Sequence, residues 1–122
     1  MADKLAMLLF RDEGVPWSEL DGDRGKEFFQ RFVDWAADLD KRGKLVAVDP
    51  LQDGGKTVRR RGAGFVVDGP YAEGREAVLG YYIVRVRDLD EAVELAKEAP
   101  HTLVGGATEV REIGAFPKPS SL

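Results

Sequence analysis

Two short segments of the chain are apolar on both of the faces that a β-strand presents. In residues 5–10, Leu5, Met7 and Leu9 alternate with Ala6, Leu8 and Phe10. In residues 80–86, Tyr81 and Ile83 alternate with Tyr82, Val84 and Val86. Successive side chains of a strand point to opposite faces, so a sheet with one face in water alternates apolar and polar residues. These segments therefore predict a sheet that is covered on both faces.

A long amphipathic helix is predicted at residues 23–42. Its expected buried stripe consists of Phe28, Phe32, Trp35 and Leu39, widened by Phe29, Val33 and Ala36. Asp21 or Asp23 is expected to cap the first turn, because a carboxylate accepts hydrogen bonds from the unpaired N–H groups there. Gly43 is expected to end the helix in a left-handed conformation.

A second helix is predicted to begin at Asp88 and to end before Pro100. Asp88 and Glu91 have the spacing of a capping box, and a proline disfavours the helical conformation in the residue before it. The side chains expected to be buried are those of Leu89, Ala92, Val93 and Ala96. His101 follows the helix and is expected to be a solvated or capping residue.

Further strands are predicted at residues 45–48, 56–59, 64–67 and 107–113, and the tail from about 115 is expected to be irregular. Residues 65–67 are apolar without interruption and are interpreted as a buried strand. The whole chain, residues 1–122, is predicted to form one domain. The order βαβ(β)βαβ favours an α+β, ferredoxin-like fold with two helices on one face of an antiparallel or mixed sheet.

The second face of this sheet needs a cover that the two helices do not supply. A second copy of the same sheet, related by a two-fold axis, is the simplest cover for a large apolar face. We therefore predict a homodimer formed by sheet-to-sheet packing. A monomer with an open apolar face is the alternative.

Composition argues against several classes of protein. The net charge is −4, whereas a dedicated nucleic-acid binder needs a surplus of basic residues, and the run Arg59–Arg61 is interpreted as a solvated hairpin edge. The absence of cysteine excludes disulfides, thiolate metal sites and a cysteine nucleophile. With a single histidine, neither a transition-metal site nor a cofactor is indicated. The apolar run at residues 5–10 is too short to span a membrane, so we expect a cytoplasmic protein without a membrane partner.

The most distinctive motif of the chain is Asp68-Gly69-Pro70-Tyr71-Ala72-Glu73, followed by Arg75-Glu76 and by Leu79-Gly80-Tyr81-Tyr82. It resembles the signature of the YCII-related family in its DGPF-type branch, which reads D-G-P-F-x-E-x-K-E before a glycine-aromatic strand. Tyr71 stands in place of the usual phenylalanine, and Arg75 stands in place of the usual lysine. The helix from Asp88 and the strand around Glu109 also match, so the resemblance covers most of the chain.

The resemblance implies a dimeric α+β barrel whose biochemical role is largely uncharacterised. Members are often described as transcription initiation proteins, which implies a sigma factor or another protein as a partner. The wider superfamily includes enzymes acting on lactones and haloaromatic breakdown products, for which a His–Asp pair is proposed. The helix at residues 23–42 contains no histidine, so that pair would lack its histidine in this chain.

Two interpretations of Asp68 remain open. In the first, its carboxylate accepts backbone N–H groups in a turn that Gly69 and Pro70 shape. In the second, it ends a buried strand at the mouth of a pocket between sheet and helices, where a partly desolvated carboxylate suits catalysis or ligand binding. The residues expected around that pocket are Tyr71, Glu73, Arg75 and Tyr81. The chain is accordingly predicted to be a small-molecule-binding protein or enzyme, or else a regulatory module that binds a protein partner.

Overall fold

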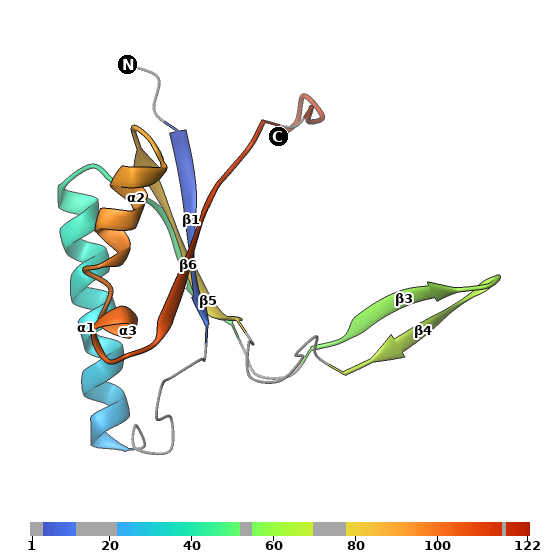
Figure 1. Cartoon of the computed structure of the whole chain (residues 1–122), viewed down its shortest axis with the longest axis horizontal. Coiled ribbons are helices and arrows are strands. Elements are labelled where there is room, and N and C mark those ends of the chain that lie inside the picture. Colours follow the sequence, from blue (N-terminus) through green and yellow to red (C-terminus); the bar gives the residue numbers. More distant parts are fainter. Residues whose placement is uncertain (1–3, 12–21, 52–54, 70–77, 116) are drawn as a thin grey trace.

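The main sheet has four antiparallel strands in the order β2-β5-β1-β6 (Figure 1). The computed structural model describes residues 4–11, 22–51, 55–69, 78–115 and 117–122. The strands of the main sheet are β1 (Lys4–Arg11), β2 (Leu45–Pro50), β5 (Val78–Val86) and β6 (Ala107–Glu112). A separate hairpin is formed by β3 (Thr57–Arg61) and β4 (Gly64–Asp68). The helices are α1 (Asp23–Lys41), α2 (Leu89–Ala96) and α3 (Pro100–Leu103).

Two strand–helix–strand units make up the main sheet. Helix α1 joins β1 to β2, and both of these strands are antiparallel to β5, which lies between them. Helices α2 and α3 join β5 to β6 in the same way around β1. This is the split βαβ arrangement of ferredoxin-like folds. The helices lie together on one face of the sheet, as the sequence predicted (Figure 1).

The hydrophobic core lies between the helices and one face of the sheet. The sheet contributes Ala6, Leu8, Phe10, Tyr82, Val84 and Val86, which are the alternate residues of β1 and β5. The indole of Trp35 stacks on the ring of Tyr82, with ring centroids 4.7 Å apart. The hydroxyl of Tyr82 donates a hydrogen bond of 2.6 Å to the carbonyl oxygen of Phe32, and burial raises the pKa of Tyr82 to about 12.

Helix α1 confirms the predicted stripe in part. Phe28, Trp35 and Leu39 are buried, but the side chains of Phe29 and Val33 are 58% and 46% exposed. The stripe is narrower than predicted because neighbouring residues of a helix lie about 100° apart around its axis, and only one stripe contacts the sheet.

Helix α1 differs from the prediction at its start and agrees with it at its end. The cap position is occupied by Gly22, which has no side chain to accept a capping hydrogen bond, so the prediction that Asp23 caps the helix was wrong. Asp21, the other predicted cap, lies outside the described residues. Asp23 is instead the first helical residue, where its charge lies near the positive end of the helix dipole. At the other end, Gly43 has a φ of 72° and ends the helix as predicted.

Helix α2 begins with the predicted capping box. The carboxylate of Asp88 accepts a hydrogen bond of 2.9 Å from the backbone N–H of Glu91, and the carboxylate of Glu91 accepts one of 2.8 Å from the N–H of Arg87. The predicted buried face is only partly correct. Ala92 and Ala96 are buried, whereas Leu89 and Val93 are exposed, and Leu95 takes their place in the core. The inward face therefore follows residues 92, 95, 96 and 99, at the i, i+3, i+4, i+7 spacing of one helical face.

A short helix, α3, follows where the sequence predicted only the end of α2. Pro100 occupies its first turn, where the missing N–H of proline costs no hydrogen bond. This extra turn carries His101 into the interior, so the prediction that His101 is solvated was wrong. No helix in the described part of the chain is long and apolar enough to cross a membrane.

The hairpin of β3 and β4 projects sideways from near one end of the main sheet, on the side away from the helices (Figure 1). We call residues Thr57–Asp68 the arm. The arm turns at Gly62, whose φ of 57° suits the first central residue of a tight two-residue turn. Phe65 and Val67 are 66% and 58% exposed, so the prediction of a buried strand here was wrong. The strand belongs to a separate two-stranded ribbon that lies away from the described helices and the main sheet (Figure 1).

Candidate functional site

Asp68 is the last residue of the arm. It pairs with Thr57 across the hairpin, so both residues lie at the base of the arm, where it joins the rest of the chain. The side chain of Asp68 is exposed, and the strand that it ends is exposed as well. Its part in ligand binding or catalysis stays a prediction. Tyr71, Glu73 and Arg75, predicted to lie near it, fall outside the described residues.

Thr57 places a buried hydroxyl group at the base of the arm, across from Asp68. Its hydroxyl oxygen is buried and has no hydrogen-bond partner among the described residues. A buried hydroxyl without a partner costs free energy, because water no longer satisfies it. The base of the arm therefore combines an exposed carboxylate with a buried hydroxyl that lacks a partner in the described part of the chain. Sequence reasoning missed Thr57, since nothing in the local pattern shows which residue pairs with Asp68.

The face of the main sheet that the helices leave uncovered is apolar along its middle. We call it the open face. On it lie half-buried side chains of β1 and β5, namely Leu5, Met7, Leu9, Leu79, Tyr81 and Ile83. The prediction that both faces of these two strands are apolar is thus correct for the single chain. The covering of the open face by a second copy stays a prediction.

Polar pairs flank this apolar middle on both sides. On the β2 side, the hydroxyl of Tyr81 donates a hydrogen bond of 3.2 Å to the carboxylate of Asp49, and this bond raises the pKa of Tyr81 above its ordinary value. On the β6 side, the Nε and Nη2 atoms of Arg11 lie 3.1 and 2.7 Å from one oxygen of Glu109. That contact lowers the pKa of Glu109. Arg11 and Glu109 were not predicted as a pair, because residues this far apart in sequence meet only through the register of the sheet.

His101 has a structural place on the helix side of the sheet. Its side chain is fully buried, and its Nε2 donates a hydrogen bond to the carbonyl oxygen of Arg11 at the end of β1. Its ring lies 5.7 Å from the ring of Phe10, centroid to centroid. These contacts join α3 to the strand end and pack the ring within the core. They give His101 the role of a core residue.

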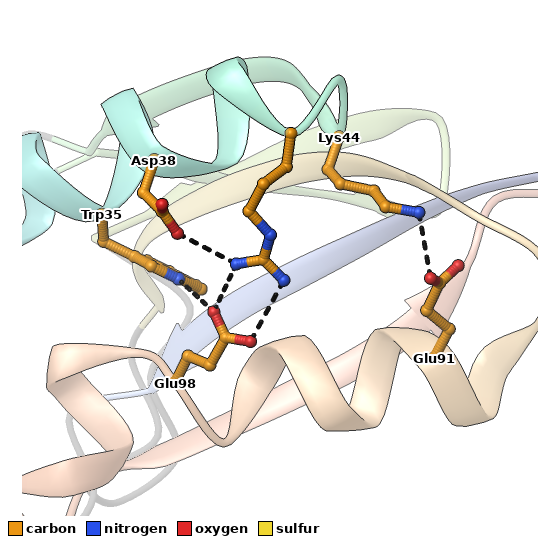
Figure 2. Close-up of polar contacts among 6 residues, drawn as sticks. Trp35, Asp38, Lys44, Glu91 and Glu98 are labelled. Carbon is orange, nitrogen blue, oxygen red and sulfur yellow. Dashed lines mark hydrogen bonds and ion pairs between the residues drawn. The ribbon is translucent and has the colours of Figure 1, made fainter.

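A polar cluster joins the end of α1 to α2 (Figure 2). The indole N–H of Trp35 donates to Glu98 at 3.2 Å, and Arg42 contacts Glu98 at 2.8 Å and Asp38 at 3.0 Å. The hydrogen bond from Arg42 is the main cause of a lowered pKa at Glu98. Each of the four side chains has a partner within the cluster, so the cluster holds two helices together.

A separate ion pair joins β2's start to α2. The Nζ atom of Lys44 lies 2.9 Å from one carboxylate oxygen of Glu91 (Figure 2). The other oxygen of Glu91 accepts the capping bond from Arg87, and this backbone bond, followed by the contact with Lys44, lowers the pKa of Glu91. Glu91 thus fixes the start of α2 against the sheet. Within the described ranges, no three His, Asp or Glu side chains are grouped so as to hold a metal ion.

Comparison with known protein families matches residues 8–117 to the YCII-related domain. The chain belongs to the YCII-related family. An uncharacterized protein of Rhizobium meliloti (strain 1021) is 28% identical over 120 residues, which cover 96% of each chain. Membership of this YCII-related family agrees with the resemblance that the sequence motif indicated. The relative is itself uncharacterised, so the comparisons name no substrate or reaction.

Proposed function

We propose that this YCII-related protein is a homodimer that binds a small polar molecule at the base of each arm, beside Asp68. The observation that carries the proposal is the buried hydroxyl of Thr57, directly across the hairpin from Asp68 and without a partner among the described residues. Buried polar groups in native proteins are nearly always hydrogen-bonded, and unsatisfied ones require an explanation. A ligand that accepts from or donates to this hydroxyl supplies one.

The two side chains define the chemistry of the ligand. The carboxylate of Asp68 accepts hydrogen bonds, so the ligand presents an amine or a hydroxyl to it. The hydroxyl of Thr57 both donates and accepts, so an oxygen atom of the ligand suits it. Small amino or hydroxy compounds fit both requirements. The residues that follow Asp68 in the motif, Tyr71, Glu73 and Arg75, are proposed to complete the site together with Tyr81.

The homodimer part of the proposal rests on the open face. Leu5, Met7, Leu9 and Ile83 are apolar and only half-buried in the single chain, although they lie at the centre of the sheet. Apolar patches of this extent usually mark contacts with another molecule. Packing against the same face of a second chain would remove them from water.

Ligand binding is tested by thermal unfolding of the pure protein with a panel of small amino acids, hydroxy acids and polyols. We expect at least one compound to stabilise the wild type, by mass action on the folded state. The same compound should not stabilise Asp68→Asn or Thr57→Val. Asp40→Asn, which changes an exposed carboxylate on α1, should respond like the wild type. If the same shift appears in all four proteins, binding lies elsewhere and the proposed site is wrong.

A regulatory module in transcription initiation is the second candidate. It is favoured by the exposed arginines of the arm, Arg59 to Arg61, which would attract an acidic surface of a protein partner such as a sigma factor. Capture of such a partner by the wild type, and its loss on changing these arginines to glutamine, would support this function. Equal capture by both proteins would show that the arginines of the arm do not bind the partner.

A further inference from the structure

The two faces of the arm differ in chemistry. In the hairpin register, Val58 lies opposite Val67, and Arg60 lies opposite Phe65. Because alternate residues of a strand share a face, these four side chains lie on one side. Thr57, Arg59 and Asp68 lie on the other. We call the first side the apolar arm face. Its three apolar side chains, Val58, Phe65 and Val67, are each 58–66% exposed, and the guanidinium of Arg60 lies 5.4 Å above the Phe65 ring.

A two-stranded ribbon of this kind is marginally stable by itself in water. Each strand of the arm has only five residues, and the arm extends away from the main sheet and the helices (Figure 1). In the single chain its most apolar side chains therefore face water at the most distant part of the molecule. A stable arm requires a surface against which the apolar arm face packs.

We infer that the apolar arm face docks on a second copy of this chain, so that each subunit holds the other with its arm. This inference rests on the homodimer of the proposed function and adds a second contact surface to it. Figure 1 shows the arm leaving the end of the sheet on the side away from the helices, which is the side of the open face. A second chain packed on the open face would therefore lie beside the arm.

The number of residues that a stable interface needs also favours a second copy of this chain as the partner of the apolar arm face. Since alternate residues share a face, the four strands of the main sheet place about 15 side chains on the open face. A stable interface takes roughly 20–30 residues from each partner. The open face alone falls short of this range. The apolar arm face adds four side chains, and the surface on which the partner's arm lands adds more.

Charge also favours a second copy. The arm carries three arginines and one aspartate between residues 57 and 68, whereas the whole chain has a net charge of −4. The rest of the chain is therefore more acidic than the whole. A basic arm is attracted to the acidic body of an identical chain. In a symmetric dimer both arms make this contact, because the two subunits are equivalent.

The chain has no cysteine, so a single introduced thiol reports on one position without interference. Phe65→Cys and Val67→Cys place it on the apolar arm face, and Arg59→Cys places it on the opposite face of the same arm as a matched control. The rate of reaction with a thiol reagent is measured for each at micromolar protein, with the mass determined by light scattering and folding by circular dichroism. A thiol buried in an interface reacts only when the interface opens, so we expect it to react at least ~10-fold more slowly than the control.

The protection should disappear when Ile83→Glu on the open face is added to the same variants, because a charge there separates the subunits. Two results would overturn the inference. Equal rates for positions 59, 65 and 67 in a dimer would show that the arm touches no second copy, and would leave the homodimer and the ligand site intact. Monomers with equally reactive thiols would overturn the homodimer together with the arm contact.

Discussion

The indole Nε1 of Trp35 donates a hydrogen bond to the carboxylate of Glu98, 3.2 Å away. A face of the same indole stacks on Tyr82 in the core. One side chain thus connects the polar cluster between α1 and α2 to the centre of the sheet. Glu98 lies two residues after the end of α2, so its contacts with Trp35 and Arg42 hold the end of that helix against α1.

We expect Glu98→Gln to destabilise the protein by up to about 1 kcal/mol, because the contact with Arg42 is half-exposed and ion pairs of this kind contribute little. The amide can still accept the indole hydrogen bond of Trp35. Urea unfolding of the variant and the wild type measures the difference. Glu94→Gln, which changes an exposed carboxylate paired with Lys97, is the control and should be nearly neutral. A loss at Glu98 no larger than at Glu94 would mean that the cluster does not hold the helices.

Acid should weaken the same contacts. The pKa values of Glu98 and Glu91 are lowered in the folded protein from 4.5, chiefly by Arg42 and by the Arg87 backbone N–H. A carboxyl group whose pKa is lower when folded stabilises the fold fully above its unfolded pKa and loses this effect as the pH falls through the folded value. The free energy of unfolding should therefore fall below about pH 4.5. A Glu91→Gln, Glu98→Gln double variant should show a shallower fall over the same range, and an unchanged slope would contradict this.

His101 is expected to contribute to stability far more than a surface histidine. His101→Ala removes a buried ring and its hydrogen bond to the Arg11 carbonyl, so the loss should be on the order of 2–4 kcal/mol. His101→Gln keeps a donor and much of the volume, and should recover part of the loss. Chemical unfolding of the three proteins tests this. If His101→Ala lowers the free energy of unfolding by less than about 0.5 kcal/mol, His101 behaves as the solvated residue that the sequence predicted.

The sequence predicted the long and repetitive parts of this fold well. Helix α1 has enough turns for its apolar stripe to stand out, and β5 combines apolar residues on both faces over nine positions. Helix α2 has only eight residues, so the pattern alone could not show that Leu95, and not Val93, faces the core. The apolar run of β4 was misassigned for a related reason. A short apolar run looks the same in a buried strand and in an exposed arm, and only the pairing of strands separates the two.

The candidate site was predictable only where a motif marked it. Asp68 was named because the motif around it is distinctive, but its partner Thr57 was not. Arg11 and Glu109 are 98 residues apart and meet only through the register of β1 with β6. Local patterns carry no information about such register. The hydrogen bond that buries His101 likewise depends on where α3 places it against the end of β1.

Asp68→Asn separates a role in the turn from a role in binding. The asparagine oxygen accepts the same backbone hydrogen bonds, so a turn residue should lose about 1 kcal/mol or less. Thr57→Val replaces the buried hydroxyl with a methyl group of similar size, so it should leave stability unchanged or slightly raised in the absence of ligand. Thermal unfolding without ligand measures both. A marked loss for Thr57→Val would mean that its hydroxyl already has a partner within the protein.

Two neighbouring residues of β5 distinguish the core from the proposed dimer contact. Val84 is fully buried under the helices, so Val84→Glu places an unpaired charge in the core and should unfold the chain, at a cost on the order of 3–5 kcal/mol. Ile83 lies on the open face and is only half-buried in the single chain. Ile83→Glu should therefore leave each subunit folded by circular dichroism, while light scattering changes from the mass of a dimer to that of a monomer. A second open-face change, Met7→Glu, should do the same, because Met7 is directly opposite Ile83 in the sheet. If the wild type already has the mass of a monomer at micromolar concentration, the open face is not a dimer contact.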